Sequence, residues 1–170
     1  SKTAAPLPTA APTQEPIYLR VNANLPAAYR QSLQLDGSNI KIVTSGKTSA
    51  ILDYGRGNPV SYWIYALAAP FPTITDEISA KTWQEFWQQA ADAPFSRLVM
   101  TAETLTAIKS RWGTPVGKVD VVDAQDLLLE AWKGENTWAV IPFEEIQPRW
   151  KIIAVNGQSP LHKDFSQIQY

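Results

Sequence analysis

The sequence predicts an α/β fold made of two small lobes that are joined by two crossing segments. The apolar run at 62–72, YWIYALAAPFP, is interrupted by a Pro-Phe step, and the run that begins at 137, TWAVIPFEEIQ, is interrupted in the same way. A chain that leaves one lobe and later returns to it needs two such crossings, and hinges lie in segments of this kind. Between the two steps, helical and strand patterns alternate, which is typical of a parallel sheet.

The N-terminal part is predicted to be rich in strands. The segment 17–22, IYLRVN, alternates between faces and contains β-branched residues, so it predicts a first strand. Apolar spacing then predicts a helix at 25–35, with Pro26 near its start, where a missing N–H is tolerated. Further strands are expected at 40–43, 50–54 and 60–69, and the Gly55-Arg56-Gly57 segment is expected to form a hairpin turn.

The next part alternates between helices and strands. Ser79 is expected to cap a helix at 80–90, because Trp83, Phe86 and Trp87 fall on one helical face. A strand at 98–100 is followed by Thr101, a predicted cap for a helix that ends at Gly113.

The last part continues the alternation and then returns towards the first lobe. A strand at 119–122 is followed by Asp123, a predicted cap for a helix at 124–133 that Gly134 ends. The final elements are expected to be a strand at 138–141, a helical turn at 144–147 and a strand at 150–155.

These patterns predict the domain organisation. Residues 1–16 are rich in Pro, Ala and Thr and are expected to form a disordered tether. Residues 17–69 together with 143–170 are assigned to the first lobe, and 71–137 to the second. Hinge positions are expected at Ala69 and Pro70 and at Pro142 and Phe143. The alternative is a single α/β sheet in which both Pro-Phe steps merely end strands.

Composition excludes several classes of function. The 170 residues carry a net charge of -1 without a block of Lys and Arg, so we expect no nucleic-acid partner. There is no cysteine, which excludes disulfides and thiolate metal sites. No apolar run reaches the roughly 20 residues that a membrane span needs. The tether and the initial Ser1 predict an extracytoplasmic domain that is anchored to a membrane through a missing N-terminal segment.

Catalytic signals are weak, so we predict no catalytic residue, no metal site and no cofactor. His162 is the single histidine, and no G-x-S-x-G motif surrounds a serine. An enzyme, a hydrolase or transferase, remains an alternative if Glu145 pairs with Asp53 or Asp120, and a purely structural interaction module is a third possibility. The tryptophans of the predicted helices are expected to pack in the core: Trp83, Trp87, Trp112 and Trp132.

A ligand site is expected at junctions between strands and helices, where N–H groups and hydroxyls face a crevice. Thr44, Ser45 and Gly46 follow one predicted strand, and Thr101 follows another. Phe71, beside the first Pro-Phe step, completes the predicted set of ligand-binding residues. The alternative is that the hydroxyls only cap or turn the backbone.

Four segments carry a resemblance to a known family: YALAAPFPTITDEIS, TWQEFWQ, TAETLTAIKSRWG and TWAVIPFEEIQPRWKIIAVNGQSPL. Over 17–170 the chain resembles the N-terminal extracytoplasmic domain of bacterial CapA-type proteins of poly-gamma-glutamate capsule biosynthesis, a domain similar to type II periplasmic solute-binding proteins. The resemblance implies a non-catalytic accessory domain that recognises a small polar ligand, an envelope polymer or a partner domain. It also implies a downstream metallophosphoesterase-like CapA domain.

Overall fold

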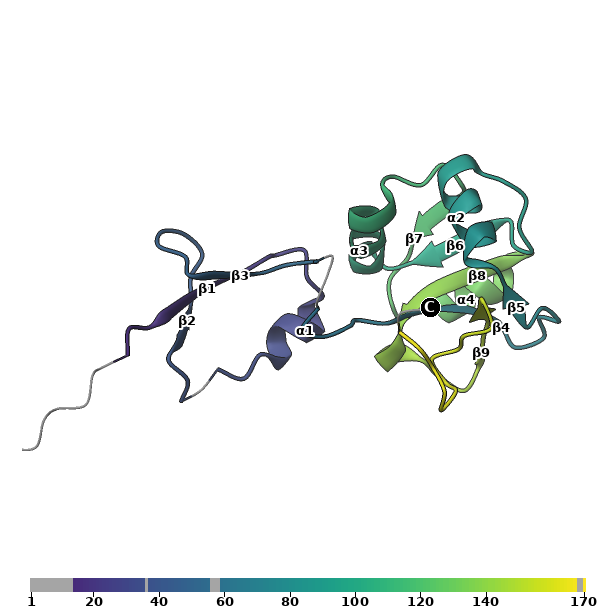
Figure 1. The fold of residues 1–170 in the computed structure, drawn as a ribbon. Coiled ribbons are helices and arrows are strands. Elements are labelled where there is room, and N and C mark those ends of the chain that lie inside the picture. Colours follow the sequence, from purple (N-terminus) through teal and green to yellow (C-terminus); the bar gives the residue numbers. More distant parts are fainter. Residues whose placement is uncertain (1–13, 36, 56–58, 168–169) are drawn as a thin grey trace, which may run out of the picture. The chain divides into compact units, whose positions relative to one another are not determined.

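The protein is a mixed α/β chain in two compact units (Figure 1). The computed structural model describes residues 14–35, 37–55, 59–167 and 170. Unit 1 ends at Tyr54 and unit 2 begins at Gly55. The predicted α/β class and the presence of two units are confirmed, but the chain passes from one unit to the other only once, so the predicted pair of crossing segments is wrong. The predicted tether and the Gly55-Arg56-Gly57 turn fall largely outside the described residues.

Unit 1 is a three-stranded parallel sheet with one helix. Its elements are β1 (Ile17–Val21), α1 (Ala27–Ser32), β2 (Ile40–Ile42) and β3 (Ala50–Leu52). The strand order is β2-β1-β3, with both pairs parallel. The helix is shorter than the predicted 25–35, since Pro26 occupies the N-cap position and the helix ends at Ser32.

The strand register of unit 1 gives its sheet one apolar face and one mixed face. One face carries apolar residues alone: Ile17, Leu19, Val21, Ile40, Ile42, Ala50 and Leu52. The other face carries Tyr18, Arg20, Lys41 and Ile51. Within the described part of unit 1, however, only Leu25 and Pro26 are buried. Unit 1 is therefore thinly packed, although its strands are paired in good register.

Unit 2 is built on a five-stranded mixed sheet of order β7-β6-β8-β4-β9. Its strands are β4 (Tyr65–Pro70), β6 (Arg97–Met100), β7 (Val119–Val121), β8 (Thr137–Pro142) and β9 (Trp150–Ile152). The strands β7, β6 and β8 are parallel, as predicted, whereas β4 runs antiparallel to both β8 and β9. A separate pair joins β5 (Glu77–Ile78), which the sequence did not predict, to β10 (Ala154–Val155).

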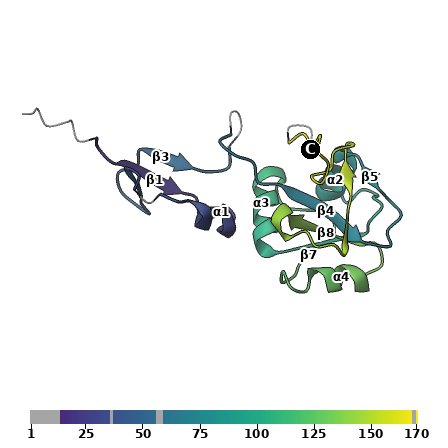
Figure 2. The same ribbon diagram turned by 90° about the horizontal axis from the view of Figure 1, so that it is seen from below.

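Helices cover the two faces of this sheet unequally (Figure 2). On one face, α2 (Ala80–Gln89) and α3 (Ala102–Trp112) pack in the larger cluster with Leu98, Met100 and Trp138. On the other face, the short helix α4 (Leu127–Lys133) packs with Val99 and Ala139 in a smaller cluster. The alternation of residues along β6 and β8 between the two clusters follows from the two-residue period of a strand.

Side-chain caps explain where α2 and α3 start. The hydroxyl of Ser79 accepts from the Thr82 N–H (3.0 Å), and that of Thr101 accepts from the Thr104 N–H (3.2 Å), so both predicted caps are confirmed. The predicted cap Asp123 is wrong, because α4 begins only at Leu127. Strand β4 begins at 65 rather than 60, and the predicted strand at 150–155 is split into β9 and β10.

The boundary between the two units differs from the predicted one. Strands β4 and β9, which were predicted to lie in the first lobe, pair within the same sheet as β6 and β8. Segment 143–170 therefore belongs with 71–137 in unit 2, and both Pro-Phe steps end strands of one sheet, as the alternative held. Ala69 pairs with Lys151, and Pro142 pairs with Tyr65, so the predicted hinge residues lie inside unit 2.

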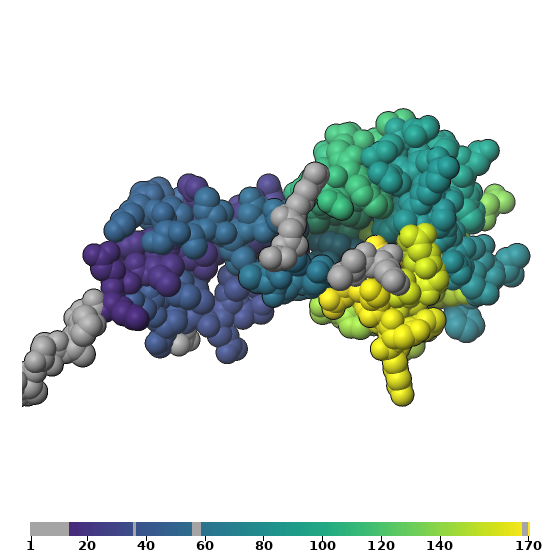
Figure 3. Space-filling model, viewed as in Figure 1, coloured from purple at the N-terminus to yellow at the C-terminus, as the bar shows by residue number. Residues whose placement is uncertain are grey.

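The C-terminal segment, yellow in Figure 3, lies on unit 2. The ring of Tyr170 packs against the larger core cluster and makes an edge contact with Phe165, with ring centroids 5.1 Å apart. Among the described residues, no helix is long and apolar enough to cross a membrane.

Candidate functional site

A cavity of about 380 Å³ opens on the face of the unit 2 sheet that α4 covers. A helix of seven residues leaves part of that face open, and the 3₁₀ turn η1 (Phe143–Glu145) carries the chain past the gap before β9 begins. The cavity is lined by Ala124, Gln125, Leu127, Leu128, Ile141, Glu144, Glu145, Ile146, Gln147, Arg149 and Trp150. A volume of this size is typical of a small-ligand pocket, for which about 300–1,000 Å³ is usual.

The floor of the cavity is part of the core. Leu127, Ile141 and Trp150 are buried and belong to the smaller core cluster, and Leu128 and Ile146 pack against that cluster. Close packing of this kind holds side chains in fixed rotamers. The floor is therefore apolar and preformed.

The rim of the cavity carries charges of both signs. Glu145 is exposed, but partial burial of its carboxyl raises the pKa above its usual value, and the neighbouring Glu103 and Glu144 raise it further by repulsion. Arg149 makes neither a hydrogen bond nor an ion pair with any other described residue. The cavity therefore offers a carboxylate that is crowded by like charges and a guanidinium that is free to bind an anion.

The topology explains why Glu103 lies near Glu145. Strands β6 and β8 are parallel neighbours, so their carboxyl ends meet at one edge of the sheet. Thr101 and Glu103 follow β6, and Glu145 follows β8. Ligands of open α/β sheets bind at this kind of edge. Thr101 was predicted as a ligand-binding residue, but it lines neither cavity. Glu103 was not predicted, although its place in the first turn after a strand was a usable signal.

A second cavity, of about 340 Å³, adjoins the first. Its lining includes Gln125, Leu128 and Arg149, which also line the first cavity. Its other lining residues are Leu129 and Trp132. Trp132 is 49% exposed, so the prediction that it packs in the core is wrong.

The remaining helical tryptophans behave as predicted. Trp83 and Trp87 are buried, and Trp112 packs on both, with ring centroids 5.0 and 5.9 Å apart. These residues supply packing on the α2 and α3 face of the sheet.

The structure does not gather the predicted ligand-binding residues into one place. Thr44, Ser45 and Gly46 lie exposed in unit 1, and the chain enters β3 after them, so the predicted junction with a helix is wrong. Phe71 is 68% exposed and follows β4, which runs antiparallel to the neighbouring β8. Phe71 therefore lies at the opposite edge of the sheet from Thr101. A ligand-binding role for these residues stays a prediction.

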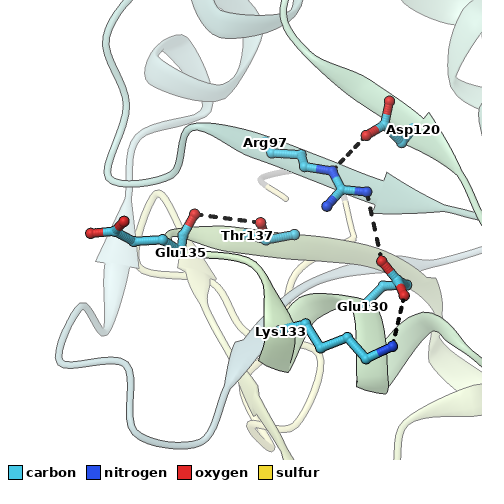
Figure 4. A network of polar contacts seen from close by, with 6 residues as sticks. All are labelled: Arg97, Asp120, Glu130, Lys133, Glu135 and Thr137. Atoms are coloured by element: carbon cyan, nitrogen blue, oxygen red, sulfur yellow. Dashed lines mark hydrogen bonds and ion pairs between the residues drawn. The ribbon is translucent and has the colours of Figure 1, made fainter.

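The carboxylates of the enzyme alternative have other partners. Asp120 accepts a hydrogen bond from Arg97 Nε (2.5 Å), and Arg97 Nη2 lies 3.9 Å from Glu130, which Lys133 also approaches (Figure 4). In unit 1, Asp53 accepts from Asn22 Nδ2 (2.6 Å). Glu145 is the one member of this predicted set that lines a cavity.

In the part of the chain that the structure describes, no group of three or more His, Cys, Asp and Glu side chains could hold a metal ion. His162 lies exposed in a turn near the C-terminus.

Comparisons with known proteins add a weak structural likeness. No family model and no curated protein matches the sequence. Among solved structures, a protein described as a phosphate ABC transporter substrate-binding protein from Clostridium perfringens, solved with bound phosphate, is similar. The TM-score is 0.46 and the identity 11%, over 84% of this chain and 76% of that one. A likeness at this level carries no argument about function, which has to be argued from the residues of the site.

Proposed function

We propose that this chain is a non-catalytic binding module whose unit 2 holds a small polar ligand in the cavity beside α4. The observation that carries the proposal is that one apolar cavity has on its rim both a guanidinium without a partner among the described residues, Arg149, and a carboxylate crowded by like charges, Glu145. Binding pockets are mostly apolar and contain a few polar groups that orient the ligand.

The charges on the rim favour a ligand that is positive at one end and negative at the other. A guanidinium binds a carboxylate through two parallel hydrogen bonds. An ammonium group beside Glu145 would offset the repulsion from Glu103 and Glu144 that raises the pKa of Glu145. Amino acids and short peptides carry both groups, whereas a simple anion would meet repulsion from the carboxylates.

The family resemblance supports a finer version of the proposal. In that version the chain is an extracytoplasmic, membrane-anchored accessory domain of capsule biosynthesis, and its ligand is poly-gamma-glutamate or a fragment of it. An oligomer of γ-linked glutamate presents one free α-carboxylate per residue for Arg149 and one terminal ammonium for Glu145. The partner would then be a downstream metallophosphoesterase-like domain.

A second candidate function rests on the same glutamate. A carboxyl whose pKa is raised by burial and by a neighbouring carboxylate is a possible general acid. Under this alternative, the protein would hydrolyse its ligand, and Glu145→Gln would abolish turnover without abolishing binding. Product analysis after prolonged incubation with a bound ligand separates the two candidates, because a binding module releases the ligand unchanged.

The test of binding is calorimetric titration at neutral pH with free amino acids, γ-linked glutamate oligomers and their N-acetylated forms. We expect at least one zwitterionic compound to bind and to raise the melting temperature by mass action. Arg149→Ala should weaken its binding by at least about tenfold, as the loss of a charged hydrogen-bonded pair predicts.

The matched control is Arg111→Ala, which removes an exposed arginine of α3 that lines neither cavity. This variant should bind as the unaltered protein does. Equal affinity of Arg149→Ala and the unaltered protein would overturn the assignment of the cavity, and so would the absence of any zwitterionic ligand.

A further inference from the structure

The two adjoining cavities point to a more specific ligand. We propose that the natural ligand is a short peptide with an apolar C-terminal residue, whose terminal carboxylate lies at Arg149 and whose last side chain lies against Trp132. This inference rests on the proposed binding function, not on its version with poly-gamma-glutamate as the ligand, and adds the class of ligand and its direction.

The arrangement of the lining residues determines the direction in which the peptide lies. The cavity of about 380 Å³ contains Glu144 and Glu145, while the one of about 340 Å³ has no carboxylate in its lining. Arg149 and Leu128 line both cavities and therefore mark where they meet. A ligand that fills both has a cationic end at Glu145, an anionic group at Arg149 and an apolar group beyond it. A peptide has these groups in this order, from its N-terminus to its last side chain.

Two large apolar side chains that line the second cavity, Leu129 and Trp132, do not pack in the core. The α4 residues of the core cluster are Leu127 and Ala131, with Leu128 packed against them. Trp132 and Leu129 are 49% and 52% exposed and do not belong to that cluster. An exposed Trp beside an arginine is typical of binding hot spots, in which Trp and Arg are enriched.

The charges distinguish a peptide from an acidic sugar. A uronic acid would also stack on an exposed indole and pair with Arg149, but it brings no cation to the carboxylates of the first cavity. The crowding of Glu145 by Glu103 and Glu144 is relieved by an ammonium group and made worse by a second anion. A peptide therefore carries a charge that is complementary to each of the two ends of the site.

The experiment is calorimetric titration of the full chain with Gly-Gly-Gly, Gly-Gly-Leu and C-terminally amidated Gly-Gly-Leu. Burying most of a leucine side chain should make Gly-Gly-Leu roughly tenfold tighter than Gly-Gly-Gly. The amidated peptide should bind at least about tenfold more weakly than its acid, since it cannot form a charged pair with Arg149. Sodium glucuronate is the sugar probe and should not bind.

Variants of α4 test whether its exposed apolar side chains cause the preference for Gly-Gly-Leu. Trp132→Ala should bring the ratio of the Gly-Gly-Leu and Gly-Gly-Gly affinities close to one, because the leucine side chain loses the surface against which it packs. Leu129→Ala should reduce the ratio more mildly and serves as a second variant if Trp132→Ala does not fold. Leu161→Ala is the matched control, because Leu161 is 56% exposed, close to the 52% of Leu129, but lines neither cavity.

The outcomes separate the two proposals. If both tripeptides bind equally and Trp132→Ala changes nothing, the preference for an apolar C-terminal residue is wrong while the binding function stands. If glucuronate binds and the tripeptides do not, the site takes sugars and the inference is overturned. If no zwitterionic compound binds, the binding function itself fails.

Discussion

Tyr65 pairs with Pro142 across the antiparallel ladder of β4 and β8. This pairing places the start of β4 beside the end of β8, so Pro70-Phe71 and Pro142-Phe143 lie at opposite edges of the sheet. The two steps are alike in sequence, but only the second adjoins the cavity, because η1 begins at Phe143. Repetition of a motif therefore did not indicate repetition of its role.

Glu145 should make the folded protein less stable as the pH rises. Its pKa is raised above the ordinary value of 4.5, so the folded state holds the proton more tightly than the unfolded state does. Stability from this group is present below pH 4.5 and is lost as the pH rises through the folded-state pKa. Glu145→Gln should therefore raise the melting temperature at pH 7 and flatten this part of the pH profile, measured by thermal unfolding from pH 4 to pH 8. The exposed Glu135→Gln is the control, and an equal gain from it would contradict the account.

Arg97 should be the costliest ion-pair residue of unit 2 to replace. Its side chain is 22% exposed and lies between Asp120 and Glu130, so Arg97→Met leaves two partly buried carboxylates without their shared cation. We expect a loss of about 1–2 kcal/mol in the free energy of unfolding, measured in urea. The exposed pair of Lys81 and Glu85 provides the control, and Lys81→Met should cost less than about 0.5 kcal/mol. Similar losses in the two variants would show that burial of Arg97 does not matter.

Gly117 should not tolerate a side chain. A methyl group there would lie 2.5 Å from the Phe86 carbonyl oxygen and 2.6 Å from its ring, at the end of α2. Gly117→Ala should cost roughly 1–3 kcal/mol, the usual range for overpacking, measured by urea unfolding. Val116→Ala, at an exposed neighbouring position, should stay within about 0.5 kcal/mol of the unaltered protein. A stable Gly117→Ala variant would mean that α2 can shift away without cost.

Tyr170 should titrate late in an alkaline pH series. Burial raises the pKa of its phenol from 10.0 to about 12, an effect that the Leu67 backbone partly opposes. Because the folded state favours the protonated form, stability falls as the pH rises from 10.0 towards 12. Ultraviolet difference spectra should show one phenol ionising near pH 12, and Tyr170→Phe should remove that step. Ionisation of every tyrosine near pH 10 would contradict the burial of this ring.

Much of the fold followed from local patterns in the sequence. The caps Ser79 and Thr101 and the stop at Gly113 were predictable because each depends on one or two neighbouring residues. The direction of β4 was not predictable, since it depends on pairing with β8, some seventy positions later in the chain. That pairing decided the boundary between the units.

The site was only partly predictable for the same reason. Thr101 was predicted from a local signal, a threonine between a strand and a helix, but it lines neither cavity, and its ligand-binding role stays a prediction. The cavity depends on how short α4 is and on the passage of 144–150 beside it, and neither follows from apolar spacing. Helical spacing also suggested that Trp132 packs in the core. That prediction was wrong because periodicity does not show how much of a helix the sheet can cover.

The contrast between the two sheets has a consequence for the chain's motions. Residues 137–141 of β8 are buried, and the strand lies between β6 and β4, with which it pairs, so its amide hydrogens should exchange with solvent only when unit 2 unfolds. No strand residue of unit 1 is buried, so amide hydrogens of β1 to β3 should exchange through small local openings. The protein should therefore lose structure in two steps, beginning in unit 1, and a protease should cut there first while the cavity beside α4 stays intact.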